Sequence, residues 1–185
     1  MARAPLLQLS SISLTFGGNP VFDDLSLTVQ PGDRIALVGS INLDIRSFAL
    51  NKELGLLQGI DAGAVKTQAL VLCPTRELAD QVGKQLRKLA TGIANLKLSV
   101  LCGGIPLAPQ LASLAHAPHV VVGTPGRVMD HMDRGTLRLD ALKLVVLDEA
   151  DRMLDMGFSE DVDRIAAAAP TERQTLLFTA TMDDA

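Results

Sequence analysis

Beyond residue 67 the sequence alternates between short apolar runs and longer segments of helical length. The runs are QALVLC (68–73), LKLSVLC (96–102), HVVVGT (119–124), LKLVVLD (142–148) and RQTLLFTA (173–180). They are apolar almost throughout, which is typical of strands buried on both faces of a parallel sheet. Because helical segments separate them, we predict a three-layer α/β domain with helices on both faces of a mostly parallel sheet.

The segments between the runs predict five helices. The first helix ends at Leu89, the second lies near 107–115, and the third extends from Pro125 to about 134. The fourth and fifth cover roughly 149–156 and 159–168. Polar residues gather directly after the apolar runs. The carboxyl ends of parallel strands share one edge of a sheet, and ligands of such sheets bind there. The sequence therefore places a functional site in the loops that follow the strands.

The first part of the chain has a different pattern, with short strand-like segments separated by turn residues. Residues 6–15 and 25–29 read as two strands, and the Gly, Asn and Pro residues at 17–20 form a turn cluster between them. We predict an antiparallel strand pair here. Residues 34–38 predict a more buried, central strand of the sheet.

A helix is predicted over 44–59, after that central strand. Leu50, Leu54 and Leu57 recur at spacings of four and three, so they fall on one helical face. This face is the nearest apolar surface that could cover the strand at 34–38.

Composition restricts the classes of function. The 185-residue chain is 48% apolar and carries a net charge of −4, which is globular but unlike a non-specific polyanion binder. Nucleic-acid contact would therefore be local. Without a run of 18 apolar residues or a signal peptide, no membrane association is expected. Cys73 and Cys102 end apolar runs and are expected to be buried thiols of a reducing, cytoplasmic compartment.

Asp148-Glu149-Ala150-Asp151 stands directly after the apolar run LVVL. One interpretation is structural, because acidic residues are favourable near the positive end of a helix. The other is catalytic: an acid at a strand end can hold Mg²⁺ through water, and a second carboxylate can orient a water for attack on phosphate. The tetrapeptide alone does not decide between them.

This tetrapeptide belongs to an ordered set of short motifs. The set is Pro74-Thr75-Arg76-Glu77-Leu78, Gly103-Gly104, Thr124-Pro125-Gly126-Arg127, Asp148 to Asp151 continuing as RMLDMGF, and Thr179-Ala180-Thr181. In order and in placement at strand ends, residues 54–185 resemble the N-terminal RecA-like domain of bacterial DEAD-box RNA helicases of the DbpA type. The resemblance implies a RecA-like P-loop-NTPase fold.

The resemblance also implies roles for individual residues. Contacts to the RNA sugar-phosphate backbone are implied for Thr75, Arg76, Gly104, Thr124 and Arg127. Asp148 would hold a metal through water if nucleotide binds, and Glu149 would act as general base. Asp151, Thr179 and Thr181 would couple nucleotide state to RNA binding. Simpler alternatives for single residues stay open, such as a surface charge for Arg76 and a helix cap for Thr124.

Residues 1–40 resemble a second family. The stretch LLQLSSISLTFGGNPVFDDLSLTVQPGDRIALVGS is similar to the opening of ABC-type ATPases of the ABC-F, Uup-like subfamily. That resemblance would put Phe16 near the adenine of a nucleotide and Gly39 at the start of the phosphate-binding loop. It stops at Ser40.

The phosphate-binding loop of both families, G-x-x-x-x-G-K-[ST], does not follow Gly39. Its second Gly should fall at 44 and its Lys at 45, where the chain has Asp44 and Ile45. An aspartate repels phosphate, and isoleucine supplies neither the charge of Lys nor the backbone freedom of Gly. Arg46-Ser47 imitates Lys-Ser one position late.

The sequence therefore predicts a single chimeric domain over 1–185, with ABC-like strands (1–40), a junction (41–53) and a helicase-like part (54–185). Three functions stay open: a helicase-core remnant with weak RNA binding, an ATPase with an improvised phosphate loop, and a folded protein without a ligand. The chain ends before a second RecA-like domain, so no unwinding is expected. No cofactor is expected, although both resembled families use Mg-ATP. RNA backbone is the expected partner, and oligomeric state is open.

Overall fold

The computed structural model describes residues 7–16, 19–29, 34–38 and 59–179. The chain divides into two compact units, residues 1–33 and 34–185. In the first unit β1 (Leu7–Phe16) and β2 (Asn19–Val29) form a two-stranded antiparallel sheet, with Leu7 opposite Val29 and Phe16 opposite Asn19. The predicted antiparallel strand pair is confirmed.

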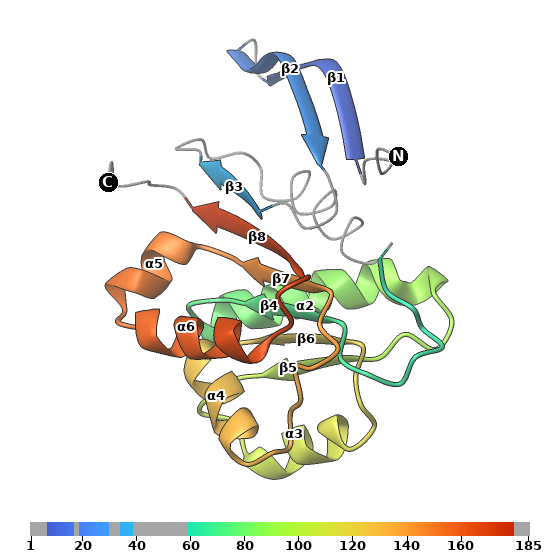
Figure 1. The fold of residues 1–185 in the computed structure, drawn as a ribbon, viewed down its shortest axis with the longest axis vertical. Helices are drawn as coiled ribbons and strands as arrows, with labels where there is room; N and C mark the ends of the chain where they lie inside the picture. Colours follow the sequence, from blue (N-terminus) through green and yellow to red (C-terminus); the bar gives the residue numbers. More distant parts are fainter. Residues whose placement is uncertain (1–6, 17–18, 30–33, 39–58, 180–185) are drawn as a thin grey trace. The chain divides into compact units, whose positions relative to one another are not determined.

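The second unit contains a six-stranded sheet whose order is β3-β8-β7-β4-β6-β5, and every neighbouring pair is parallel (Figure 1). Its strands are β3 (Arg34–Val38), β4 (Ala69–Leu72), β5 (Leu98–Leu101), β6 (Val120–Gly123), β7 (Leu144–Leu147) and β8 (Gln174–Thr179). Each of the five apolar runs beyond residue 67 thus contains one strand. The predicted parallel sheet and RecA-like α/β fold class are confirmed.

Five α-helices and a short 3₁₀ helix connect the strands described beyond residue 58. They are α2 (Arg76–Leu89), η1 (Ala90–Gly92), α3 (Leu107–Leu114), α4 (Pro125–Asp133), α5 (Ala150–Asp155) and α6 (Ser159–Ala168). The predicted helix positions agree with these bounds to within a few residues. No helix in the described ranges is both long and apolar enough to cross a bilayer.

Alternate residues of the strands face two separate apolar cores. Leu70 and Leu72 of β4 lie in a core that α3, α4, α5 and α6 complete. Ala69 and Val71 lie in the other, against α2. Because every residue of β4 is buried, its sequence cannot alternate between apolar and polar, and it reads as a continuous apolar run.

One detail of the sequence prediction is wrong. Residues 34–38 were expected to form a central strand, whereas β3 lies at the edge of the sheet and pairs with β8 alone among the described strands. An apolar run reports that both faces of a strand are covered, and it does not report how many strands flank it. The helix predicted over 44–59, Gly39 and Thr181 lie outside the described residues.

Candidate functional site

The loops after β4, β5, β6 and β7 carry most of the residues that the motifs single out. Because the strands are parallel, these loops lie along one side of the sheet, here called the carboxyl edge. The opposite side, where β4, β6 and β7 begin, is called the amino edge.

Two threonines stand at helix amino termini on the carboxyl edge. The Thr75 hydroxyl oxygen accepts a hydrogen bond from the N–H of Leu78 at 3.2 Å and caps α2. Thr124 precedes α4, but its side chain makes no capping hydrogen bond. Helix capping therefore explains one hydrogen bond of the Thr75 hydroxyl, whereas it does not explain the presence of Thr124. Both lie where backbone N–H groups and the helix dipole favour an anion.

Arg76 packs against Gly104. Gly104 adopts a φ of +71°, and a Cβ there would overlap Arg76 Nη1 and lie 3.2 Å from Arg76 Cζ. A side chain at this position would therefore displace the guanidinium, and the left-handed backbone also favours glycine. The amino terminus of α2 and the loop after β5 are thus brought into contact.

Arg127 reaches the same loop from α4. Its Nη1 donates to the carbonyl oxygen of Ile105 at 3.3 Å, and its Nε lies 3.8 Å from Asp130 Oδ2. Only 16% of the Arg127 side chain is exposed. Two guanidinium groups, from α2 and α4, therefore approach the loop that contains Gly103 and Gly104.

Both guanidinium groups act electrostatically on the Cys102 thiol. Burial raises the pKa of Cys102, and the backbone N–H of Thr124 and the charges of Arg127 and Arg76 oppose that effect. The thiol is buried and reduced, as the sequence predicted. Because burial dominates, the Cys102 side chain stays a neutral thiol, and it belongs to the apolar core that faces α2.

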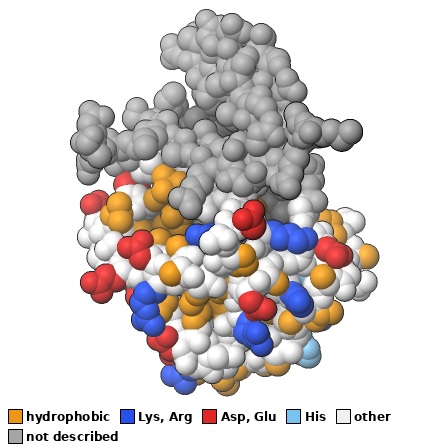
Figure 2. Space-filling model, in the orientation of Figure 1, with side chains coloured by type: hydrophobic (Ala, Val, Ile, Leu, Met, Phe, Trp, Pro, Cys, Tyr) orange, Lys and Arg blue, Asp and Glu red, His pale blue; other side chains and the backbone are white. Residues whose placement is uncertain are grey.

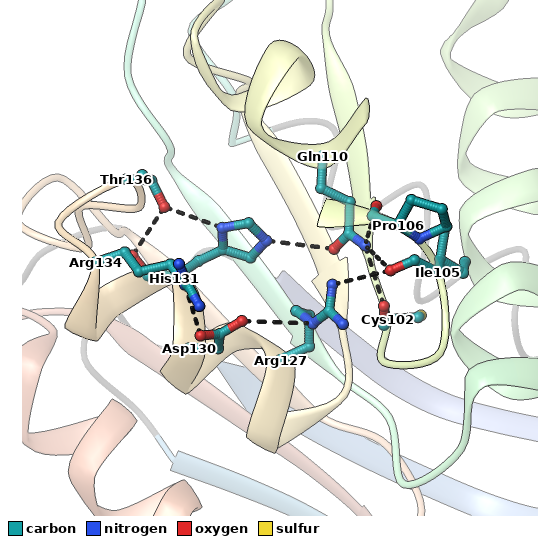
Figure 3. A network of polar contacts seen from close by, with 9 residues as sticks. All are labelled: Cys102, Ile105, Pro106, Gln110, Arg127, Asp130, His131, Arg134 and Thr136. Atoms are coloured by element: carbon teal, nitrogen blue, oxygen red, sulfur yellow. Dashed lines mark hydrogen bonds and ion pairs between the residues drawn. The ribbon is translucent and has the colours of Figure 1, made fainter. Parts of the chain in front are cut away.

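A buried polar network that the sequence interpretation missed lies beside Arg127 (Figure 3). Gln110 of α3 and His131 of α4 are both buried, and His131 Nε2 lies 3.3 Å from Gln110 Oε1. Gln110 Nε2 donates to the Cys102 carbonyl at 3.1 Å. One sequence signal existed, since Gln110 interrupts the apolar positions of the helix LAPQLASL.

The acidic motif begins where β7 ends. The Asp148 N–H donates to the Leu72 carbonyl at 2.9 Å and extends the β4–β7 ladder. Glu149 adopts a left-handed conformation, with φ 53° and ψ 56°. Its Oε2 lies 3.1 Å from Arg152 Nη1, and Asp151 Oδ1 accepts from the Arg152 N–H at 2.9 Å.

The backbone of Glu149 is left-handed, which costs a residue other than glycine about 1–2 kcal/mol. Asn95 and Ala117 also have positive φ angles, so this conformation does not by itself decide between the structural and the catalytic interpretation. Thr179, the last residue of β8, lies at the end of the strand next to β7. The structure therefore brings the acidic motif and Thr179 to adjacent strand ends, as the motif order requires.

Residues 51–185 match the family model described as DEAD/DEAH box helicase. This chain belongs to that family. The chain is 61% identical over 132 residues to the ATP-dependent RNA helicase DbpA of Escherichia coli (strain K12), covering 71% of this chain and 29% of that protein. It is 53% identical over 117 residues to a DEAD-box ATP-dependent RNA helicase CshA of Geobacillus kaustophilus, covering 63% of this chain and 25% of that protein.

A solved structure of a DEAD box protein from the hyperthermophile Methanococcus jannaschii has the same fold. Its TM-score is 0.71 at 40% identity, and the match covers 82% of this chain and 40% of that one. The chain thus spans less than a third of the length of the curated helicases it matches. The family match begins at residue 51, so the resemblance of residues 1–40 to ABC-type ATPases and the role of Phe16 stay predictions.

The sequence lacks part of what the helicase family's Mg-ATP needs. The described residues contain no group of three or more His, Cys, Asp or Glu side chains that could hold a metal ion, but Mg²⁺ needs no such group, because one carboxylate can hold it through water. The Glu149 carboxylate is paired with Arg152. In addition, the sequence has Asp44 and Ile45 where a phosphate-binding loop needs Gly and Lys.

Proposed function

We propose that this chain is a DEAD-box helicase core that contacts the sugar-phosphate backbone of RNA at the carboxyl edge, weakly and without sequence preference. The observation that carries the proposal is the convergence of Arg76 and Arg127 on the loop of Gly104 and Ile105. Guanidinium forks, hydroxyls and helix amino termini all suit phosphate oxygens.

Each predicted RNA-contact residue has a physical role in this proposal. Arg76 and Arg127 supply charge, and Gly104 lets the backbone approach a phosphate closely because it has no side chain. Thr75 and Thr124 supply hydroxyl donors beside exposed helix N–H groups. Contacts of this kind recognise the backbone and not the bases, so binding is indifferent to base sequence.

Weak affinity follows from the charge of the chain. Its net charge is −4, and on the face shown in Figure 2 basic and acidic side chains are interspersed. A broad basic surface would be needed to release many counterions, and two arginines release few. Binding should therefore be weak at physiological salt and should weaken further as salt rises, in proportion to the few phosphates neutralised.

We further propose that the chain is a chimera, of engineered origin, in which β3 replaces the family's own strand before the phosphate-binding loop. Two observations support this. The family resemblances change within the short junction 41–53. The structural match covers 82% of the chain, whereas the match to DbpA covers 71%, so structural similarity extends past the helicase-like sequence.

Little or no ATP hydrolysis is expected, because the phosphate-binding Gly and Lys are replaced by Asp44 and Ile45. Calorimetric titration with Mg-ATP should give a dissociation constant weaker than about 1 mM, which corresponds to about 4 kcal/mol. A low-micromolar constant would instead support the alternative function, an ATPase in which Arg46-Ser47 forms an improvised loop. The observation that favours this alternative is the position of the acidic motif directly after β7, at the carboxyl edge.

Titration of a fluorescent single-stranded RNA tests the main proposal. Arg76→Ala and Arg127→Ala should each weaken binding several-fold. Arg138→Ala is the matched control, because Arg138 is an exposed arginine that precedes β7 at the amino edge and lines a pocket there. Equal affinities for all four proteins would show that the carboxyl edge is not the RNA surface. Complete absence of binding would favour a folded protein without a ligand.

A further inference from the structure

The loop between β5 and α3, residues 102–106, is held from inside by one side chain. Gln110 is 5% exposed, and its Nε2 lies 3.1 Å from the Cys102 carbonyl oxygen, 3.4 Å from that of Pro106 and 3.5 Å from that of Ile105 (Figure 3). Carbonyl oxygens only accept hydrogen bonds, so the amide nitrogen of Gln110 must face the loop and its oxygen must face away.

The orientation of Gln110 determines which ring nitrogen of His131 carries the proton when the ring is neutral. Gln110 Oε1 lies 3.3 Å from His131 Nε2, and because that oxygen only accepts, Nε2 carries a proton. The other ring nitrogen, Nδ1, lies 2.9 Å from the Thr136 hydroxyl, which donates to it when the ring is neutral. The chain of hydrogen bonds therefore runs from Thr136 through His131 and Gln110 to the loop.

We propose that Gln110, oriented by His131, is a positioning residue that presets the loop of Gly103 and Gly104 for the RNA backbone. This inference rests on the proposed function. The loop needs such support because two glycines in succession carry the largest conformational entropy. Ordering the loop before binding removes that cost from the binding step.

The same contacts link the loop to Arg127. The Ile105 carbonyl oxygen accepts from both Gln110 Nε2 and Arg127 Nη1, at 3.5 and 3.3 Å. Displacement of this carbonyl would therefore release the guanidinium from its position. Gln110 thus acts on both the proposed backbone contacts of the loop and the proposed phosphate contact of Arg127.

The amino edge offers a matched control of the same chemistry. Gln68 is 2% exposed, and its Nε2 donates to the carbonyls of Asp61 at 2.7 Å and Ala64 at 3.2 Å. Its Oε1 accepts from the Asp61 N–H at 3.0 Å. Gln68 therefore holds a loop as Gln110 does, but it precedes β4 and so lies away from the proposed RNA surface.

The experiment compares Gln110→Glu with Gln68→Glu by amide hydrogen exchange and by RNA titration. A carboxylate in place of the amide nitrogen removes the donor and faces carbonyl oxygens, so each substitution should loosen its own loop. In Gln110→Glu, exchange at Gly103, Gly104 and Ile105 should accelerate by roughly tenfold, and RNA affinity should fall by a similar factor, about 1.4 kcal/mol. In Gln68→Glu, neither quantity should change.

Gln110→Met, which keeps the volume without adding charge, is the second variant if Gln110→Glu does not fold, and the same two changes are expected. Unchanged exchange at residues 103–105 in the folded Gln110 variant would overturn the inference. Accelerated exchange with unchanged RNA affinity would overturn the positioning role. If the wild-type chain binds no RNA, the proposed function fails and the RNA role fails with it, while exchange still decides whether Gln110 orders the loop.

Discussion

The two edges of the sheet share much of their chemistry, yet only one carries the helicase motifs. Each edge has a buried glutamine that holds a loop and arginines close to helix or strand ends. The amino edge has a pocket of about 430 Å³ that includes Lys66, Thr67, Leu137 and Arg138 in its lining. The presence of a pocket therefore does not by itself identify the functional side of this domain.

The two edges differ in how their arginine side chains are paired. At the amino edge Arg138 is paired with Asp140 at 3.3 Å on the surface. At the carboxyl edge Arg76 lies against a glycine, and none of the ion pairs between described residues involves it. Arg127 keeps one contact to a loop carbonyl and a longer one to Asp130. An arginine whose charge is not neutralised locally keeps more of its attraction for phosphate.

Close packing should make the carboxyl edge much less tolerant of added volume than the amino edge. A Cβ at Gly123, the last residue of β6, would lie 2.6 Å from the Leu101 carbonyl oxygen and 2.9 Å from Val128 Cγ2. Gly123→Ala should therefore lower the free energy of unfolding by about 3 kcal/mol, because backbone must move. Denaturant titration measures this effect.

Gly135→Ala is the matched control at the amino edge. Gly135 has a φ of +66°, and a Cβ there meets no atom within 4 Å. The cost should be about 1 kcal/mol, from the left-handed backbone alone. Equal costs for the two substitutions would mean that packing at the end of β6 is looser than the distances indicate.

Salt dependence sharpens the comparison of the two edges. A single-stranded nucleic acid contributes a slope of about −0.7 in log K against log salt for each neutralised phosphate. Arg76→Ala and Arg127→Ala should each reduce the magnitude of the slope by about that amount, and Arg138→Ala should leave it unchanged. Titrations at four or five salt concentrations measure it. A reduced slope in Arg138→Ala would place the RNA on the amino edge or on both edges.

Local sequence predicted the sheet well because strands buried on both faces have few acceptable compositions. β4 and β6 are buried at every residue, so their apolar runs and the turn residues after them mark their ends closely. The position of β3 at the edge could not be predicted, because strand order depends on contacts between segments distant in sequence. An apolar pattern contains no information about those partners.

The candidate site was predicted unevenly for a related reason. Arg76 and Arg127 stand in recognisable motifs, and the structure brings both to one loop. Gln110 and His131 stand outside any motif that we identified, and their importance follows from burial and from each other. A polar residue in an amphipathic helix gives little indication from sequence of whether it faces solvent or holds a loop.

The smallest expected effect is a pH dependence of stability that belongs to the carboxyl edge. Burial lowers the pKa of His131, the charges of Arg127 and Arg134 lower it further, and Asp130 opposes them in part. The hydrogen bond from Arg134 lowers the pKa of Asp130, so this carboxylate stays charged in the same pH range. Gln110, the neighbour from α3, is uncharged. His131 is therefore the group of this network whose lowered pKa makes stability depend on pH.

The sign follows from the direction of the shift. An unfolded histidine takes up its proton near pH 6.5, and the folded chain does so only at lower pH. Between these two values the unfolded state binds more protons, so the free energy of unfolding falls as pH falls, by at most about 1.4 kcal/mol per pH unit for one group. Above pH 6.5 this contribution is fully present.

Denaturant unfolding between pH 7.5 and 5 measures this contribution, with His131→Gln and His116→Gln as the variants. In His131→Gln the free energy of unfolding should fall less as pH falls, because the contribution of one titrating group is removed. His116→Gln, at an exposed position after α3, should keep the wild-type profile. The network tolerates the protonated ring, because Nδ1 can then donate to the Thr136 hydroxyl, which in turn donates to the His131 carbonyl oxygen 3.0 Å away. The decline should therefore be gradual, without loss of cooperative unfolding. An identical pH profile in wild type and His131→Gln would show that burial does not lower the pKa of His131, because a histidine with the same pKa in the folded and unfolded states adds no pH dependence.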